Sequence, residues 1–152
     1  MGTAACGLAR TASPSGIPPS SHAPASSPSP SLGQVLGTAS NASGWTAVVT
    51  AEPGAQLLDT VTVRGPLTVL GGCVPTLTAW AETPAGARVP TPTPSPEMHC
   101  MAIALVPIPA GTSRAFSASL PEPAQPGTYT IQATLKTEGA LGPSVPVVTI
   151  ST

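Results

Sequence analysis

The sequence predicts an all-β protein: an antiparallel β-sandwich of seven to eight strands behind a disordered N-terminal spacer. Three observations predict this fold. Apolar and polar residues alternate with a period of two in several short segments, turn-forming residues separate those segments, and no segment combines a 3.6-residue period with helix caps. The 152 residues suit one domain, and with only 3% aromatic residues its core should be small and aliphatic.

The first part of the chain is typical of a spacer. Residues 11–31 include six prolines and eight serines, with no aromatic residue and no apolar period. Such a segment cannot bury enough apolar surface to offset the entropy that it would lose on ordering. We therefore divide the chain into a spacer, residues 1–44, and a sandwich domain, residues 45–152.

The start of the chain resembles the end of a bacterial lipoprotein signal, whose cysteine becomes the acylated first residue. Small residues precede Cys6, Gly7 follows it, and a Pro/Ser-rich tether comes after. The five residues before Cys6 are too few for the charged and apolar regions of a secretory signal. Two interpretations stay open: the natural start lies upstream and Cys6 is lipidated, or this is an Ala-rich N-terminus with a free thiol.

Alternation is clearest in residues 128–136, where Tyr129, Ile131, Ala133 and Leu135 should face the core and polar residues the solvent. Shorter segments rich in threonine and valine follow the same logic, because branched side chains pack well on a pleated sheet. Proline and glycine turns separate them. In chain order the expected strands are 45–51, 60–64, 67–70, 76–82, 98–106, 116–120, 128–136 and 145–150.

A proline repeat interrupts the strands. Pro90, Pro92, Pro94 and Pro96 occupy every second position after Val89. Proline cannot donate a hydrogen bond to a ladder, so we expect this segment to lie outside the sheets as a stiff, extended loop. It is either a rigid connector or an interaction loop.

The charge content excludes several classes of partner. Only 7% of the residues are charged, five basic and six acidic. A nucleic-acid-binding surface needs a basic stripe, and a polybasic membrane anchor needs a basic cluster. We therefore expect no nucleic-acid partner, and contact with a membrane only through a lipid anchor.

The cysteines bear on the cellular compartment. If Cys6 is acylated, Cys73 and Cys100 remain as a pair. A disulfide closing a loop of this size would stabilise a thin core by about 3–4 kcal/mol and would require an oxidising compartment. The alternative is two buried, reduced thiols in a cytosolic protein.

Met98, His99, Cys100 and Met101 form the only cluster of soft metal ligands. Imidazole and thioether groups suit copper, but neighbouring residues of a strand face opposite sides, and a disulfide would remove the thiolate. A weak copper site at His99 with Met98 or Met101 is thus an alternative to ordinary strand residues, and no other cofactor is expected. Catalysis is not expected either, since Asp59 is the only aspartate and no Gly-x-Ser-x-Gly motif occurs.

Three segments resemble parts of an immunoglobulin-like domain. Residues 76–89 look like a strand, a glycine turn and a returning strand, residues 107–112 look like the proline–glycine step before the next strand, and residues 125–131 are similar to a Pro-Gly-x-Tyr entry into a late strand. Their order resembles the immunoglobulin-like domain of the Bsu-type intracellular proteinase inhibitor family, related to domains of exported bacterial lipoproteins. The resemblance covers roughly residues 57–135 and implies an immunoglobulin-like sandwich.

These expectations combine into one hypothesis, a non-catalytic binding or assembly module of the bacterial cell envelope, extracytoplasmic and lipid-anchored. Its expected partner is an envelope or surface-layer protein, contacted through edge strands and proline loops. The first alternative is a copper-binding protein or a dismutase-like copper enzyme, and the second is a proteinase inhibitor.

Overall fold

The computed structural model describes residues 31–72, 75–91, 102–139 and 144–152. These ranges form nine strands and no helix, so the predicted all-β class is confirmed. Residues 1–30, which include Cys6 and most of the predicted spacer, lie outside the described ranges. The described part of the chain thus has no helix that could cross a membrane.

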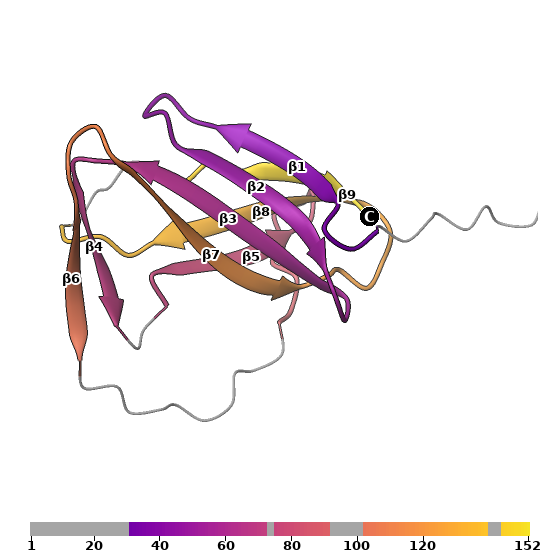
Figure 1. Cartoon of the computed structure of the whole chain (residues 1–152). Coiled ribbons are helices and arrows are strands. Elements are labelled where there is room, and N and C mark those ends of the chain that lie inside the picture. Colours follow the sequence, from indigo (N-terminus) through magenta and orange to yellow (C-terminus); the bar gives the residue numbers. More distant parts are fainter. Residues whose placement is uncertain (1–30, 73–74, 92–101, 140–143) are drawn as a thin grey trace, which may run out of the picture.

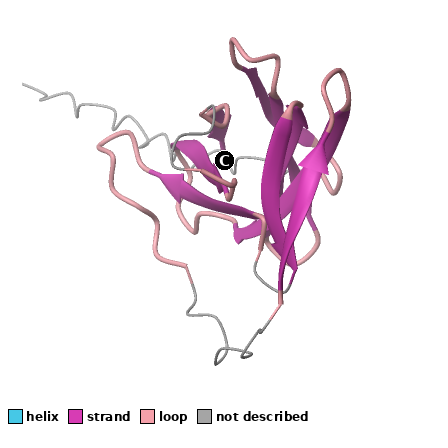
Figure 2. Cartoon of the chain, turned by 90° about the vertical axis from the view of Figure 1, so that its left-hand side faces the viewer, coloured by secondary structure: helices cyan, strands magenta, loops and turns pink. Residues whose placement is uncertain are grey.

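The strands form two antiparallel layers that face each other (Figures 1 and 2). In both layers every pair of neighbouring strands is antiparallel. The first layer has the order β1 (Val35–Ser40), β2 (Thr46–Glu52), β3 (Gln56–Arg64) and β7 (Ser113–Pro121). The second layer has the order β5 (Leu77–Glu82), β8 (Thr128–Leu135) and β9 (Val148–Ser151).

A two-stranded ribbon of β4 (Leu67–Gly72) and β6 (Ile103–Ile108) continues the ladder between β3 and β7 beyond a bend. Gly65 and Pro66, joined by a cis peptide bond, form one side of the bend. A Cβ atom on Gly65 would collide with the carbonyl oxygens of Ile108 and Pro109, so the two backbones can approach this closely only at a glycine.

Beyond the bend, β4 pairs with the chain that follows β8. The N–H of Leu70 donates to the Lys136 carbonyl at 2.8 Å, and the N–H of Glu138 donates to the Thr68 carbonyl at 2.9 Å. The ribbon therefore begins as an extension of the first layer and attaches to the second, as sandwich strands do when they change sheets at a bend.

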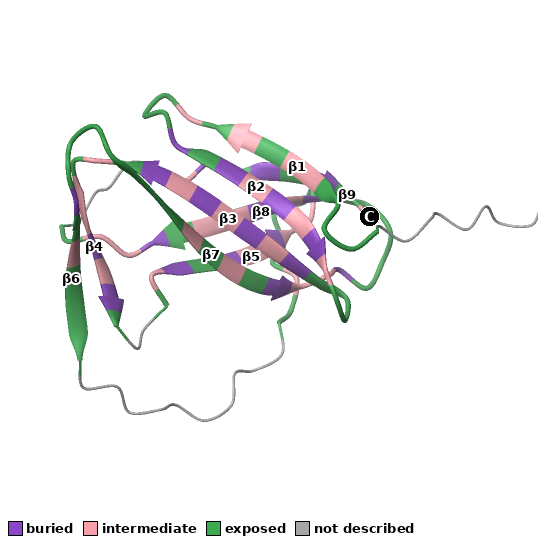
Figure 3. Ribbon diagram, in the orientation of Figure 1, coloured by how far each residue is buried: buried purple, intermediate pink, exposed green. Residues whose placement is uncertain are grey.

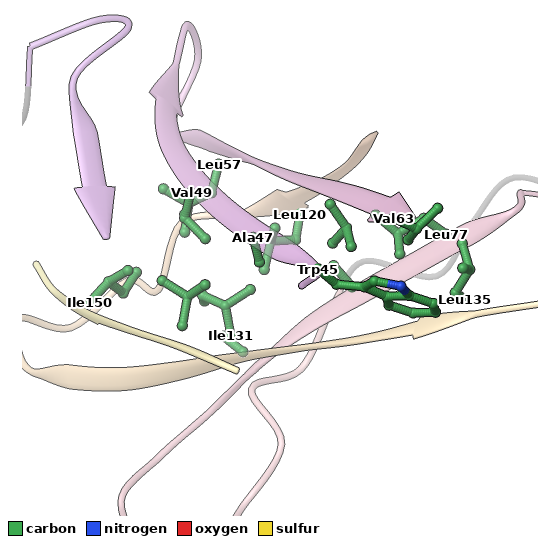
Figure 4. Close-up of a cluster of buried hydrophobic side chains, with 14 of the residues drawn as sticks. Trp45, Ala47, Val49, Leu57, Val63, Leu77, Leu120, Ile131, Leu135 and Ile150 are labelled. Carbon is green, nitrogen blue, oxygen red and sulfur yellow. The ribbon is translucent and has the colours of Figure 1, made fainter. Parts of the chain in front are cut away.

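The core lies between the layers and is mostly aliphatic, as expected (Figure 4). Buried and more exposed residues alternate along β2 and β3, which is the period-two pattern of the sequence (Figure 3). Trp45 is the largest fully buried side chain. Its Nε1–H donates to the Arg64 carbonyl at 3.3 Å, and its backbone N–H donates to Asn41 Oδ1 at 3.0 Å.

Tyr129 ties the entry of β8 to the preceding turn. Its hydroxyl donates to the Gln125 carbonyl at 2.9 Å, while its ring is buried in the core. A tyrosine that bonds back to the chain just before a late strand is a hallmark of immunoglobulin-like sandwiches. The Pro-Gly-x-Tyr segment of the sequence thus lies at the turn that leads into β8.

The structure differs from the sequence prediction at the N-terminal side of the domain. Strand β1 lies within residues 1–44, the range assigned to the spacer, so the sheet begins ten residues before Trp45. The pairing register of β1 shifts between Val35 and Gly37, and no clean alternation marks the strand. At Gly37 a Cβ would come within 2.7 Å of Thr149 O, because β1 crosses close to β9.

Candidate functional site

The outer strand of the ribbon, β6, exposes apolar side chains. Ile103 is 67% exposed and Leu105 is 55% exposed, and Pro107 on the same face is exposed too. The opposite face of the strand turns inward, since Ile108 is buried and Val106 packs against the core. In Figure 3 most of β6 has the colour of exposed residues, and the strand lies at the margin of the molecule.

Hydrogen bonding shows which way the backbone of β6 is directed. Leu70 N–H and Thr68 C=O bond to the Lys136–Glu138 segment, so both groups point away from β6. Their ladder partners are Leu105 and Pro107. In an antiparallel ladder the N–H and C=O of one residue point to the same side, so these two pairs are non-hydrogen-bonded pairs.

It follows that Ile103, Leu105 and Pro107 direct their backbone groups to the outer edge of β6. Among the described strands only β4 pairs with β6. The edge therefore offers two N–H groups, on Ile103 and Leu105, and three carbonyls. Pro107 has no N–H to offer, which is why proline is tolerated at this position of an edge strand.

This edge also lacks charge. Neither β4 nor β6 includes a charged residue, whereas β7, which continues the same edge beyond the bend, has the exposed residues Arg114, Ser117 and Ser119. Natural sandwiches commonly protect edge strands with charged side chains, which oppose pairing with another chain. We define the free edge of β6 by Ile103, Leu105 and Pro107, and it has no such charge.

Two other edges in the described part of the chain are covered. The N–H of Val89 donates to the Ala81 carbonyl at 2.8 Å, so the chain after β5 lies along that strand. At the opposite side of the sandwich, Gly37 of β1 lies against Val148 and Thr149 of β9. The free edge of β6 thus differs from these two in being both apolar and open.

Asp59 is the one buried charged residue in the described part of the chain. It lies on the inward face of β3 between Leu57 and Val61, and its ladder neighbours are Val49 and Ala118. Its Oδ1 atom has no hydrogen-bond partner. Burial in this apolar environment raises the pKa of the carboxyl from 3.8 to about 6.

A polar cluster covers the outer face of β5 and β8. Trp80 Nε1–H donates to Glu82 Oε1 at 2.7 Å, Gln132 Nε2–H donates to Glu82 Oε2 at 3.4 Å, and the Arg88 guanidinium lies 4.6 Å from the centre of the Trp80 ring. These groups use each other as partners, so the cluster holds the returning chain onto the sheet.

Most of the residues that the sequence analysis singled out lie outside the described ranges. This applies to Cys6, Cys73, Met98, His99, Cys100, Met101, Pro92, Pro94 and Pro96. Pro90 is described: it is exposed and lies outside the strands, directly after the segment that pairs with β5. Within the described ranges, no three His, Cys, Asp or Glu side chains gather as metal ligands would.

Neither the free edge of β6 nor the burial of Asp59 was among the features predicted from the sequence. Signals for both exist in the sequence. The uncharged run from Ile103 to Ile108 includes a proline, which is confined to edge strands or bulges. Asp59 occupies the same phase as Leu57, Val61 and Val63, so the alternation itself places it on the inward face.

Comparison with known proteins found no match: no family model fits the sequence, and no curated protein or solved structure is similar to the chain at a significant level.

Proposed function

We propose that this protein is a non-catalytic binding or assembly module of the bacterial cell envelope, and that it associates with another polypeptide through the free edge of β6. The observation that supports this most directly is the coincidence of exposed apolar side chains and outward-directed backbone groups on Ile103 and Leu105. Solvent-exposed strand edges of this kind are where proteins add a strand from another chain.

The chemistry of the edge defines the kind of partner. The backbone groups of Ile103, Leu105 and Pro107 would bond to an extended strand, and the exposed isoleucine and leucine would pack against its apolar side chains. The absence of charge on β4 and β6 means that short-range contacts, and not long-range steering, would determine the association. A partner fixed in the same envelope would suit such a surface.

The proposed location is extracytoplasmic, with a lipid anchor at Cys6 and the Pro/Ser-rich segment as a tether. The partner would then be an envelope or surface-layer protein held at the same membrane. Anchoring raises the local concentration of two proteins, so an association that is weak in solution becomes effective at a surface.

Photo-crosslinking in cells that make the protein tests the proposed function. A photoreactive phenylalanine analogue at Leu105 should crosslink to a polypeptide that mass spectrometry identifies as an envelope protein, because this position lies in the centre of the free edge. The same analogue at Ser119, an exposed position of β7, serves as the control. Equal crosslinking at both positions, or none at Leu105, would contradict the proposal.

An extracytoplasmic location also predicts a disulfide between Cys73 and Cys100. Gly72, which precedes Cys73, is the ladder partner of Ile103, which follows Cys100 by three residues. In protein isolated from its native envelope, alkylation without reductant should leave both thiols unmodified. Replacing both cysteines with serine should lower the free energy of unfolding by about 3–4 kcal/mol. Full alkylation of Cys73 and Cys100 before reduction would disprove the bridge.

A further inference from the structure

We infer that the polypeptide added at the free edge of β6 is a second copy of this chain, paired antiparallel about a twofold axis through Leu105. The inference rests on the proposed use of this edge for association and names its partner. Three properties of the edge support it: its hydrogen-bonding groups, its side chains and its charge.

The hydrogen-bonding groups of the edge are self-complementary. In an antiparallel pair centred on Leu105, each Leu105 N–H meets the Leu105 carbonyl of the second copy, and each Ile103 N–H meets the Pro107 carbonyl of the second copy. Both outward N–H groups of each copy thus find an acceptor. Because Pro107 has no N–H, the Ile103 carbonyl of each copy has no hydrogen bond in the ladder. Every outward N–H of the edge has a partner.

The side chains match in the same arrangement. Leu105 would pack beside Leu105 of the second copy, and Ile103 beside Pro107 of the second copy, on the face where all three are exposed. On the other face, Ala104 would lie opposite Val106 of the second copy. The two ribbons would then form one sheet, and the Lys136–Glu138 segment of each copy, bonded to its β4, would form the two outer edges of that sheet.

The absence of charge matters because of the symmetry. A twofold axis places identical surfaces opposite each other, so a charged edge would face its own charge. With no charged residue in β4 or β6, the pair meets no such repulsion. β7 differs, since it includes the exposed charged residue Arg114.

Sedimentation equilibrium of the full chain from about 10 to 500 µM tests the inference, a range that brackets the affinity of a small interface. We expect a reversible monomer–dimer equilibrium. Leu105→Lys should weaken it at least tenfold, because two like charges would meet at the axis. Val35→Lys is the matched control: Val35 is 54% exposed on the outer strand β1, and its variant should dimerise like the wild type.

A second variant separates backbone pairing from nonspecific apolar contact. Leu105→Pro keeps an apolar side chain and removes an N–H that points away from β4, so the fold should be retained while dimerisation weakens at least tenfold. A chain that stays monomeric over the whole range, or a dimer unaffected by both variants at Leu105, would overturn the inference. A monomer that still crosslinks at Leu105 to another envelope protein would overturn it and leave the proposed function intact.

Discussion

At pH 8, Asp59→Asn is expected to raise the free energy of unfolding by about 3 kcal/mol, because the wild type must hold an ionised carboxylate in the core there. Val49, Leu57, Val61 and Ala118 surround the side chain on the inward face of its sheet, and no group hydrogen-bonds to Oδ1. A carboxyl pKa displaced from 3.8 to about 6 corresponds to this free energy. Asparagine keeps the shape of the side chain and cannot ionise.

The effect should depend on pH with a definite sign. The folded-state pKa of Asp59 lies above the unfolded value, so between the two the native state binds more protons than the unfolded state. The free energy of unfolding of the wild type should therefore fall as the pH rises from about 4 to about 6, and this contribution should be constant above that window. The variant should lack this decline, and the two proteins should be about equally stable near pH 4.

Urea denaturation at several pH values measures both quantities. Glu138→Gln is the control, since it removes one carboxylate from an exposed position and should leave the decline between pH 4 and 6 unchanged. The interpretation of Asp59 as an uncompensated buried acid would be wrong if Asp59→Asn were less stable than the wild type at pH 8. That result would mean that the carboxylate has a partner in solution.

Trp45→Ala should have the largest destabilising effect, a loss of about 3–5 kcal/mol in the free energy of unfolding. Trp45 is the largest fully buried side chain, and its indole N–H is bonded to the Arg64 carbonyl at the end of β3. Its removal would leave a cavity and an unpaired carbonyl close to the bend between β3 and β4. For a domain with a small aliphatic core, this is a large part of the total stability.

The other tryptophan provides the matched control. Trp80 is half-buried on the outer face of β5, where its neighbours are polar, so Trp80→Ala should cost less than half as much. Chemical denaturation followed by circular dichroism compares the two variants on the same scale. Equal losses, or a loss below about 1 kcal/mol for Trp45→Ala, would contradict the position of Trp45 in the core.

Much of the sandwich could be predicted from the sequence because the alternation of apolar and polar residues directly encodes which face of a strand is buried. The strand at residues 128–135 and the turn before Tyr129 follow from this alternation and from proline and glycine. Strand β1 could not be predicted in the same way. Its register shift and Gly37 serve a close crossing over β9, and this is a long-range contact that no local pattern reveals.

The candidate site was harder to predict for a similar reason. The apolar run at residues 103–108 is typical of a buried strand. Its proline indicates an edge strand or a bulge, but the direction of the Leu70 and Thr68 hydrogen bonds is needed to show which edge is open. The sites predicted from the sequence instead consist of chemically distinctive residues such as Cys73, His99 and Cys100, which lie outside the described ranges. Side-chain chemistry is visible in a sequence, whereas a free edge depends on how the strands are ordered.

The bend at Gly65 and Pro66 has a consequence for how the protein unfolds. Strands β4 and β6 follow directly on β3 and β7 of the first layer, and β4 is bonded to the segment after β8 of the second layer. The two layers cannot separate without breaking hydrogen bonds between β4 and the segment after β8. A partly unfolded intermediate would therefore lose backbone hydrogen bonds in both layers at once. Such sharing favours all-or-none denaturation over stepwise melting of separate halves.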